Sequence, residues 1–269
     1  MLLIDGHSLA FRSFYAFSKG GEGGLATKDG RPTSVTYGFL KALLENGKSL
    51  KPQGVAIAFD TAEPTFRHKA DANYKAHRDV APEVFFQDLE QLQQILRSQL
   101  NLPVCMAPGF EADDLIGCLA KRAEKEGFDV FMMTPDKDFA QLVSDKIRMY
   151  RPGRGGNPPT VWGPDEVRER YGLEDPLQVI DLLGLMGDSA DNIPGVPGIG
   201  EKTAIKFLQA YGSMEGLYNN LDQLKGKMKE KVEENAELGR LSRKLAEIKT
   251  DCDVQFHAED YEMCPPDAE

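Results

Sequence analysis

The sequence predicts an α/β fold in which a mainly parallel sheet is flanked by helices and followed by a smaller helical region. Short apolar runs alternate with helical patterns over the first two thirds of the chain, which is typical of parallel sheets. Several of these runs stop at a carboxylate, and after Asp188 only helical patterns remain. With 269 residues, the chain is long enough for one large domain and an annex.

The individual elements follow from hydrophobic periodicity and from turn residues. Strands are expected where apolar runs are bounded by polar residues, at residues 1–4, 54–59, 103–106, 129–133 and 147–150. Helices are expected at residues 34–46, 82–99, 111–126, 163–171, 176–186, 202–211, 214–220 and 227–248. Loops are expected at residues 19–32 and 151–159, which are dense in glycine and proline.

The net charge of −11 does not exclude a nucleic-acid partner, because the acids are unevenly distributed. Seven of them lie between Asp251 and Glu269, in a stretch that contains no Lys or Arg. Nine more belong to the cluster described below, so the remaining surface has an excess of positive charge. The distribution of charge therefore matters more than its sum.

No run approaches the roughly 20 apolar residues that span a bilayer, and no signal-peptide pattern precedes the first strand. A soluble cytoplasmic protein without a membrane partner is therefore expected. The four cysteines have neither CxxC nor zinc-site spacing. They are expected to be reduced thiols, with the first two buried: Cys105, Cys118, Cys252 and Cys264.

Nine acidic residues follow expected strands or open a helix. They are Asp5, Asp60, Glu111, Asp113, Asp114, Asp136, Asp138, Asp188 and Asp191. The carboxyl ends of parallel strands share one edge of the sheet, where ligands of open α/β sheets bind. Crowded carboxylates raise one another's pKa unless cations neutralise them, and Mg²⁺ or Mn²⁺ prefers such oxygen ligands. Two ions about 4 Å apart would clamp the attacking and leaving oxygens of a phosphodiester.

Each acidic motif also has an ordinary structural interpretation. Acids in the first turn of a helix complement the helix dipole, which would explain Glu111, Asp113 and Asp114. Asp136 and Asp138 follow an apolar run and would cap the next helix. Three acids within four residues repel one another, however, and the whole set together favours a metal site.

A basic and aromatic segment follows Asp60. It contains Phe66-Arg67-His68-Lys69 and then Tyr74-Lys75-Ala76-His77-Arg78. Lys and Arg contact phosphates, and an exposed aromatic ring offers a base a stacking surface. A solvated charged loop is the alternative, but the position beside the acidic cluster favours nucleic acid. A carboxylate site has no need of His68 or His77.

Residues 193–204 are rich in glycine and lead into a helix. Their GxxGxG order, without a preceding strand, disfavours a dinucleotide site and favours a helix-hairpin-helix that grips duplex backbone. The expected DNA-binding positions there are Gly195, Gly198, Gly200, Lys202 and Thr203. The nearby lysines either extend this basic face or keep a helix soluble: Lys225, Lys227, Lys229 and Lys231.

These motifs together resemble the 5′ nuclease (flap endonuclease) superfamily, and most closely the N-terminal 5′-3′ exonuclease domains of bacterial DNA polymerase I. The resemblance extends from Met1 to about Asp253. It implies a PIN-like catalytic domain over residues 1–175 with a helical arch at about 61–100. It further implies a helix-hairpin-helix (H3TH) DNA-binding region over 176–250, which leaves an acidic tail over 251–269.

The implied activity is structure-selective hydrolysis of DNA at 5′ flaps and nicks by two metal ions, for RNA primer removal and repair. By position, one metal group comprises Asp5, Asp60, Glu111, Asp113 and Asp136, and the other Asp114, Asp138, Asp188 and Asp191. Arg12, Lys75 and Arg78 match positions near the scissile and 5′ phosphates, with Tyr74 beside them and Arg67 as a further DNA contact. Backbone carbonyls of the hairpin would hold K⁺.

The resemblance also implies a monomer associated with the bacterial nucleoid. Both an excised domain of a polymerase and a free-standing nuclease remain compatible with the sequence. A PIN-type ribonuclease would share the carboxylates but lack the hairpin, and a non-catalytic DNA-binding module would not need the complete acidic set. A Mg²⁺-dependent phosphatase is disfavoured because Asp5-Gly6-His7 lacks the second Asp of its nucleophile motif.

Overall fold

A computed structural model describes residues 1–18, 24–153, 156–254 and 256–262. Its single sheet has the strand order β3-β2-β1-β4-β5-β6. The strands are β1 (Leu2–Asp5), β2 (Val55–Ala58), β3 (Val104–Cys105), β4 (Val130–Met133), β5 (Ile147–Arg151) and β6 (Thr160–Trp162). All neighbours pair in parallel except β5 and β6, which are antiparallel. The expected mainly parallel sheet is therefore confirmed.

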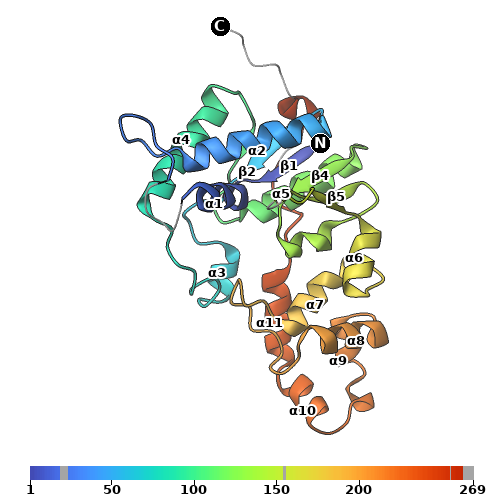
Figure 1. The fold of residues 1–269 in the computed structure, drawn as a ribbon. Helices are drawn as coiled ribbons and strands as arrows, with labels where there is room; N and C mark the ends of the chain where they lie inside the picture. The colour runs from blue at the N-terminus through green and yellow to red at the C-terminus, as the bar shows by residue number, and fades with distance from the viewer. Residues whose placement is uncertain (19–23, 154–155, 255, 263–269) are drawn as a thin grey trace.

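Helices cover both faces of this sheet (Figure 1). One face carries α1 (Gly6–Phe17), α2 (Ser34–Leu50) and α4 (Glu83–Ser98), which share a core with Leu2 and Ile4. The other face carries α5 (Ala112–Lys125), which shares a core with Leu3. Because β1 is buried on both faces, its sequence is continuously apolar rather than alternating.

The second half of the chain forms the helical region, which extends from one end of the sheet domain (Figure 1). It contains α6 (Pro164–Tyr171), α7 (Gln178–Met186), α8 (Glu201–Tyr211), α9 (Met214–Tyr218), α10 (Gly226–Glu234) and α11 (Ala236–Ala246). Short 3₁₀ turns occur at Lys137–Leu142, Leu221–Gln223 and Ala258–Tyr261. The core under α5 continues into these helices, so both parts share one hydrophobic interior.

Several elements differ from those expected. Helix α1 was not among the expected helices. The Asp5 carboxylate accepts from the backbone N–H of Ser8 and caps this helix. The short helix α3 (Phe66–Ala70) and the edge strand β6 were also missed. The single helix expected over 227–248 is two helices, which meet at Asn235.

Part of the range predicted for the helical arch is packed in the core of the sheet domain. Helix α4 lies within the predicted 61–100 range, but Phe85 and Leu92 pack in the core against the sheet. The buried Asp88 carboxylate accepts from the backbone N–H groups of Val35 and Thr36 at the start of α2. The rest of the predicted range, residues 61–82, is called the arch segment below.

Residues 256–262, which lie within the predicted acidic tail, are packed against the domain. The rings of Phe256 and Tyr261 stack 5.2 Å apart, and Glu262 forms an antiparallel bridge with Gly54, just before β2. This contact lies at the amino edge of the parallel strands. Residues 255 and 263–269, including Cys264, lie outside the described part of the chain.

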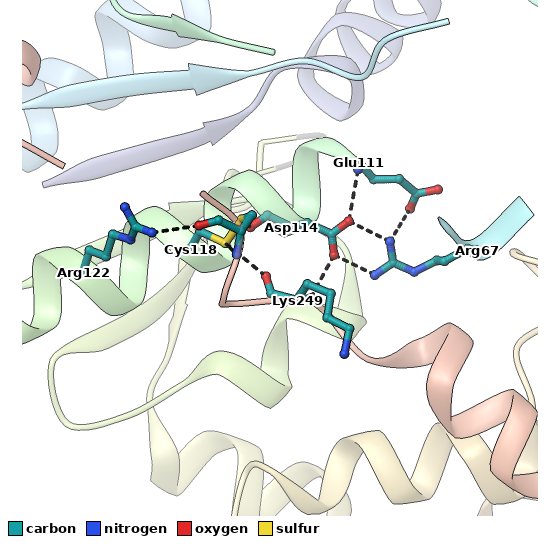
Figure 2. Close-up of a disulfide and its surroundings, with 7 residues drawn as sticks. Arg67, Glu111, Asp114, Cys118, Arg122 and Lys249 are labelled. Atoms are coloured by element: carbon teal, nitrogen blue, oxygen red, sulfur yellow. Dashed lines mark hydrogen bonds and ion pairs between the residues drawn. A yellow bond between two sulfur atoms is a disulfide. The ribbon is translucent and has the colours of Figure 1, made fainter. Parts of the chain in front are cut away.

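The expectation of four reduced thiols is wrong for Cys118 and Cys252, which form a disulfide (Figure 2). Cys105 is free, and burial raises the pKa of its thiol to about 11. The disulfide fastens the chain that leaves α11 onto α5, although the two cysteines are 134 residues apart. Such a distant pairing leaves no spacing pattern in the sequence. Within the described residues, no helix is both long and apolar enough to cross a membrane.

Candidate metal centre and nucleic-acid interface

A pocket of about 550 Å³ opens at the carboxyl edge of the sheet. Strand β1 ends in Asp5, and Asp60 and Asp136 follow β2 and β4 within three residues. The pocket is lined by six of the predicted acids, namely Asp5, Asp60, Asp113, Asp136, Asp188 and Asp191. Parallel strand ends, the first turn of α5 and the loop after α7 thus bring these carboxylates together.

Hydrogen bonds hold several of these carboxylates in place. Asp5 accepts from the Ser8 N–H and from the Thr134 hydroxyl, both at 3.0 Å. Asp60 accepts from the Ala112 N–H at 2.7 Å, at the start of α5. Asp136 accepts from the Asp138 N–H at 3.0 Å, which caps the following turn. The capping interpretation and the metal interpretation are therefore compatible, since each oxygen can accept more than one contact.

The acids are strongly coupled electrostatically. Burial, with a further contribution from Asp60 and Asp136, raises the pKa of Asp5 to about 7. Burial and the neighbouring Asp5 raise the pKa of Asp113 well above its ordinary range. The pKa of Asp191 is lowered instead, because Lys75 and Arg78 outweigh the effect of its burial. A cation in the pocket would relieve the repulsion that Asp5 and Asp113 experience from their acidic neighbours.

The donor set fits hard divalent cations. Carboxylate oxygens are the ligands that Mg²⁺ and Mn²⁺ prefer, and a bound cation would favour the ionised form of these buried acids. Asp138 adds a buried Oδ1 atom that has no hydrogen-bond partner among the described residues. In the described part of the chain, no group of three or more His, Cys, Asp or Glu side chains is placed so that it could hold a metal ion as it stands. The acids line a pocket instead of converging on one point.

We expect the metal-free protein to become less stable as pH rises from about 4 to about 7. Asp5 has a pKa of about 7 when folded and 3.8 ordinarily. Between these values the folded chain binds more protons than the unfolded chain, so stability decreases with increasing pH. Divalent cations need the ionised carboxylates and should restore stability most at higher pH.

The measurement is the urea midpoint in EDTA and in Mg²⁺ across this pH range. Asp5→Asn is the matched variant, because an amide does not titrate there and should flatten the EDTA profile. An EDTA profile of the wild-type protein that rises between about pH 5 and about pH 7 would contradict the assignment.

The arch segment brings two cations to the pocket. The Lys75 ammonium lies 2.9 Å from Glu111 Oε2 and 3.6 Å from Asp191 Oδ2. Arg78 forms an ion pair with Asp191 and donates to the carbonyl of Ala190. The backbone of Lys75 is in the left-handed region, with φ 55°. Its N–H donates to the Asp191 carbonyl. Lys75 and Arg78 therefore lie where they were expected, beside the acids.

Tyr74 and Glu111 lie just beneath these cations. The Tyr74 hydroxyl donates to Glu111 Oε2 at 3.0 Å and to Asp191 Oδ2 at 3.1 Å. Its side chain is buried, with 3% of the residue exposed, so the ring has no free face for a base. The expectation of an exposed aromatic beside the DNA is wrong for Tyr74. Its hydroxyl orients two acids instead.

Asp114 and Arg67 form a buried pair, which corrects two predictions (Figure 2). Two nitrogens of Arg67 each donate to one Asp114 oxygen at 2.8 Å. Asp114 also accepts from the backbone N–H groups of Glu111 and Lys249. Because both of its oxygens are occupied by Arg67 and by these two N–H groups, Asp114 is not available to a metal. Arg67, which is 2% exposed, is not available to DNA.

Arg12 lies beside a different pocket. It donates to the carbonyl groups of Pro152 and Gly153 and lines a separate pocket of about 420 Å³ between α1, α2 and the residues after β5. It does not line the carboxylate pocket, and its place near the scissile or 5′ phosphate stays a prediction. It lies one helical turn from Ser8, which does line the carboxylate pocket.

The glycine-rich hairpin joins α7 to α8, as expected. Gly195 is buried, and a Cβ there would approach the Gly187 nitrogen to 2.3 Å, so this glycine permits packing against the end of α7 rather than contact with DNA. Gly198, Gly200 and Lys202 are exposed. The Lys231 ammonium lies 2.6 Å from the position of a Cβ on Gly198, so α10 extends the basic face.

Several residues that line the carboxylate pocket were missed from the sequence. They are His7, Ser8, Phe11, Lys137 and Arg151. His7 Nδ1 accepts from the Asp60 N–H at 3.0 Å and so helps to orient that strand end. Lys137 stands between Asp136 and Asp138 in the sequence, and Arg151 ends β5. Each lies at or after the end of a parallel strand, at the same sheet edge as the acids, and this position could have identified them.

Two family descriptions match consecutive parts of the chain. Residues 1–172 match the "5′-3′ exonuclease, N-terminal resolvase-like domain", and residues 174–269 match the "5′-3′ exonuclease, C-terminal SAM fold". DNA polymerase I of Synechocystis is 43% identical over 269 residues, which cover 98% of this chain and 27% of that protein. The thermostable DNA polymerase I of Thermus thermophilus is 43% identical over 95% of this chain and 29% of its own length. The chain thus spans less than a third of these relatives.

Solved structures show the same fold at lower identity. A zinc-bound T5 5′-exonuclease aligns with a TM-score of 0.75 and 23% identity, over 93% of this chain and 90% of that one. A variant of the bacteriophage T5 flap endonuclease, in a pseudo-enzyme–product complex with DNA and metal ions, gives 0.75 and 23% over 93% and 89%. Since both halves match its descriptions, the chain belongs to the 5′-3′ exonuclease family.

Proposed function

We propose that this chain is a structure-selective 5′ nuclease that hydrolyses DNA phosphodiester bonds at 5′ flaps and nicks. The observation that carries the proposal is the pocket itself, in which six carboxylates from several parts of the chain meet Lys75 and Arg78 of the arch segment. Acids alone would repel a phosphate, and cations alone would not bind divalent metal. Their combination suits a phosphodiester held against metal ions.

The proposed cofactors are two Mg²⁺ or Mn²⁺ ions. Asp5, Asp60, Glu111, Asp113 and Asp136 would hold one, and Asp138, Asp188 and Asp191 the other. When bound, such ions supply a water of lowered pKa and stabilise charge on the leaving oxygen. K⁺ at the hairpin carbonyls is a further part of the proposal.

The chain's own residues would position the substrate. Lys75 and Arg78 would orient the phosphate and stabilise the negative charge that develops on it, in place of their present contacts with Glu111 and Asp191. Tyr74 would keep those two acids in place through its hydroxyl. The arch segment, whose Lys75 and Arg78 line the pocket, would limit access to a single strand.

The hairpin would grip the duplex beside the cut. Exposed Gly198 and Gly200 allow a DNA backbone to approach, and Lys202, Thr203 and Lys231 would contact phosphates without reading bases. The relatives are polymerases, so a linked polymerase module is a proposed partner, together with a role in primer removal and repair. We further propose that the chain acts as a monomer associated with the bacterial nucleoid.

The test is incubation with a 5′-labelled flap duplex in Mg²⁺, with product sizing. We expect cleavage within a nucleotide or so of the junction and none in EDTA. A flap of the same sequence in RNA is the matched substrate control. Preferential cutting of the RNA would favour a PIN-type ribonuclease, and binding without cutting in either Mg²⁺ or Mn²⁺ would leave a DNA-binding module.

A further inference from the structure

A second pair of cations lines the carboxylate pocket. Lys137 and Arg151 come from the β4 and β5 side of the sheet, whereas Lys75 and Arg78 come from the arch segment. In the strand order, the ends of β1 and β4, with Asp5 and Asp136, lie between β2 and β5. The end of β5 is therefore about 10 Å from the end of β1, two strand spacings away.

We propose that Arg151, assisted by Lys137, binds the phosphate on the 3′ side of the scissile phosphate. This inference rests on the proposed function. In the proposed function, the arch segment would receive the single-stranded 5′ end. The other side of the pocket, where Lys137 and Arg151 lie, would then face the part of the same strand that is 3′ to the cut. Neither residue was expected from the sequence to contact DNA.

Arg151 is held ready for such a contact. Its guanidinium lies 4.6 Å from the centre of the Trp162 ring, and it donates to the Pro135 carbonyl at 3.3 Å. The bond to Pro135 is the one hydrogen bond that the Arg151 guanidinium makes with the described residues. A guanidinium has five N–H donors, so others can bind a phosphate. The contact with the Trp162 ring and the bond to Pro135 restrict this side chain, so less side-chain entropy remains to be lost when a phosphate binds.

Lys137 contributes charge rather than a fixed geometry. Its ammonium lies 2.9 Å from Asp188 Oδ2, and 40% of the side chain is exposed. It begins the 3₁₀ turn that Asp136 caps, so its backbone position is fixed. A DNA strand that crosses six carboxylates needs positive charge on both sides, because one flank alone would leave the neighbouring phosphate facing acids.

The decisive experiment combines a protein change with a substrate change. Flap cleavage by wild-type protein and by Arg151→Ala is measured on two substrates, one natural and one with an uncharged methylphosphonate in place of the 3′-neighbouring phosphate. We expect Arg151→Ala to lower kcat/KM roughly tenfold or more on the natural flap, as for a charge-assisted hydrogen bond. On the methylphosphonate flap the same change should have less than about a twofold effect, because the partner charge is already gone.

Arg148→Ala is the matched control. Arg148 lies on the same strand, donates to the Asp145 carbonyl and is not among the residues that line the pocket. The Arg148→Ala variant should cut each of the two substrates at the same rate as the wild-type protein does. Arg151→Lys, which keeps the charge, should recover part of the lost activity, and Lys137→Ala should show the same substrate dependence more weakly.

The outcomes separate this inference from the proposed function. If the wild-type protein does not cut the natural flap, the proposed function fails first. If it cuts, and Arg151→Ala is unchanged or is impaired equally on both substrates, only the phosphate assignment is overturned. The single tryptophan gives a second readout. In the Asp113→Asn background, Trp162 fluorescence should change more on binding the natural flap than on binding the methylphosphonate flap, and equal changes would also overturn the assignment.

Discussion

Replacing Asp113 with asparagine is expected to lower flap cleavage by at least about a hundredfold, since a catalytic metal contributes several kcal/mol. The same change should stabilise the metal-free protein at alkaline pH. Asp113 lies in the first turn of α5, where burial and Asp5 raise its pKa well above the ordinary range. At pH values where the carboxylate is ionised, the neutral amide removes that repulsion. The expected gain in stability therefore disappears at acidic pH, where the carboxyl group is already protonated.

The two readouts are the single-turnover cleavage rate in Mg²⁺ and the urea midpoint in EDTA. Asp165→Asn is the matched control, because Asp165 is an exposed acid in the first turn of α6 and pairs with Arg168. It should change stability by less than about 0.5 kcal/mol and leave cleavage unaltered. If Asp113→Asn cut at the wild-type rate, Asp113 would not be a metal ligand. If it were less stable at every pH, the carboxylate would be a structural cap.

Much of this site could be predicted because it depends on local signals. A carboxylate that follows an apolar run marks the end of a parallel strand, and the sheet then brings such ends together. Asp5, Asp60 and Asp136 were located in this way, and the pocket contains them. The core of the central strand was equally readable, since β1 is apolar without alternation.

The error at Asp114 had a signal that was available. Successive residues of an α-helix point about 100° apart, because one turn takes 3.6 residues. Asp113 and Asp114 are adjacent in α5, so their side chains leave the helix in different directions, and of the two Asp113 lines the pocket. The contact between Asp114 and Arg67 was not readable, because the two residues are 47 positions apart and Arg67 is also held by Leu245 and Glu247, 178 and 180 positions away.

The burial of Tyr74 and Arg67 was hidden for the same reason. A segment rich in Lys, Arg and aromatic residues has the composition of an exposed loop, and only the distant α5 and α11 show that part of it is covered. The disulfide between Cys118 and Cys252 is also a long-range contact. Local pattern thus predicted what lies at the strand ends, whereas packing between distant segments decided which charged groups remain exposed.

Arg67→Met is expected to destabilise the protein by about 3 to 5 kcal/mol, the usual cost of removing one partner from a buried ion pair. Besides its two bonds to Asp114, Arg67 donates to the carbonyl groups of Leu245 and Glu247 at the end of α11. The pair therefore joins the arch segment, the helix that carries Asp113, and the exit from the helical region. Methionine fills similar volume but leaves the Asp114 charge buried without its cation.

Urea denaturation measures the change, and Arg31→Met is the matched control. Arg31 pairs with Asp29 on the surface, where the two side chains are 68% and 62% exposed, and its loss should cost less than about 0.5 kcal/mol. Arg67→Lys should fall between these values, because an ammonium cannot reproduce the two parallel bonds to Asp114. The expectation from the sequence that Arg67 contacts DNA makes the opposite prediction. If Arg67 contacted DNA, Arg67→Met would weaken flap binding and leave the urea midpoint unchanged, and that result would overturn the structural role assigned here.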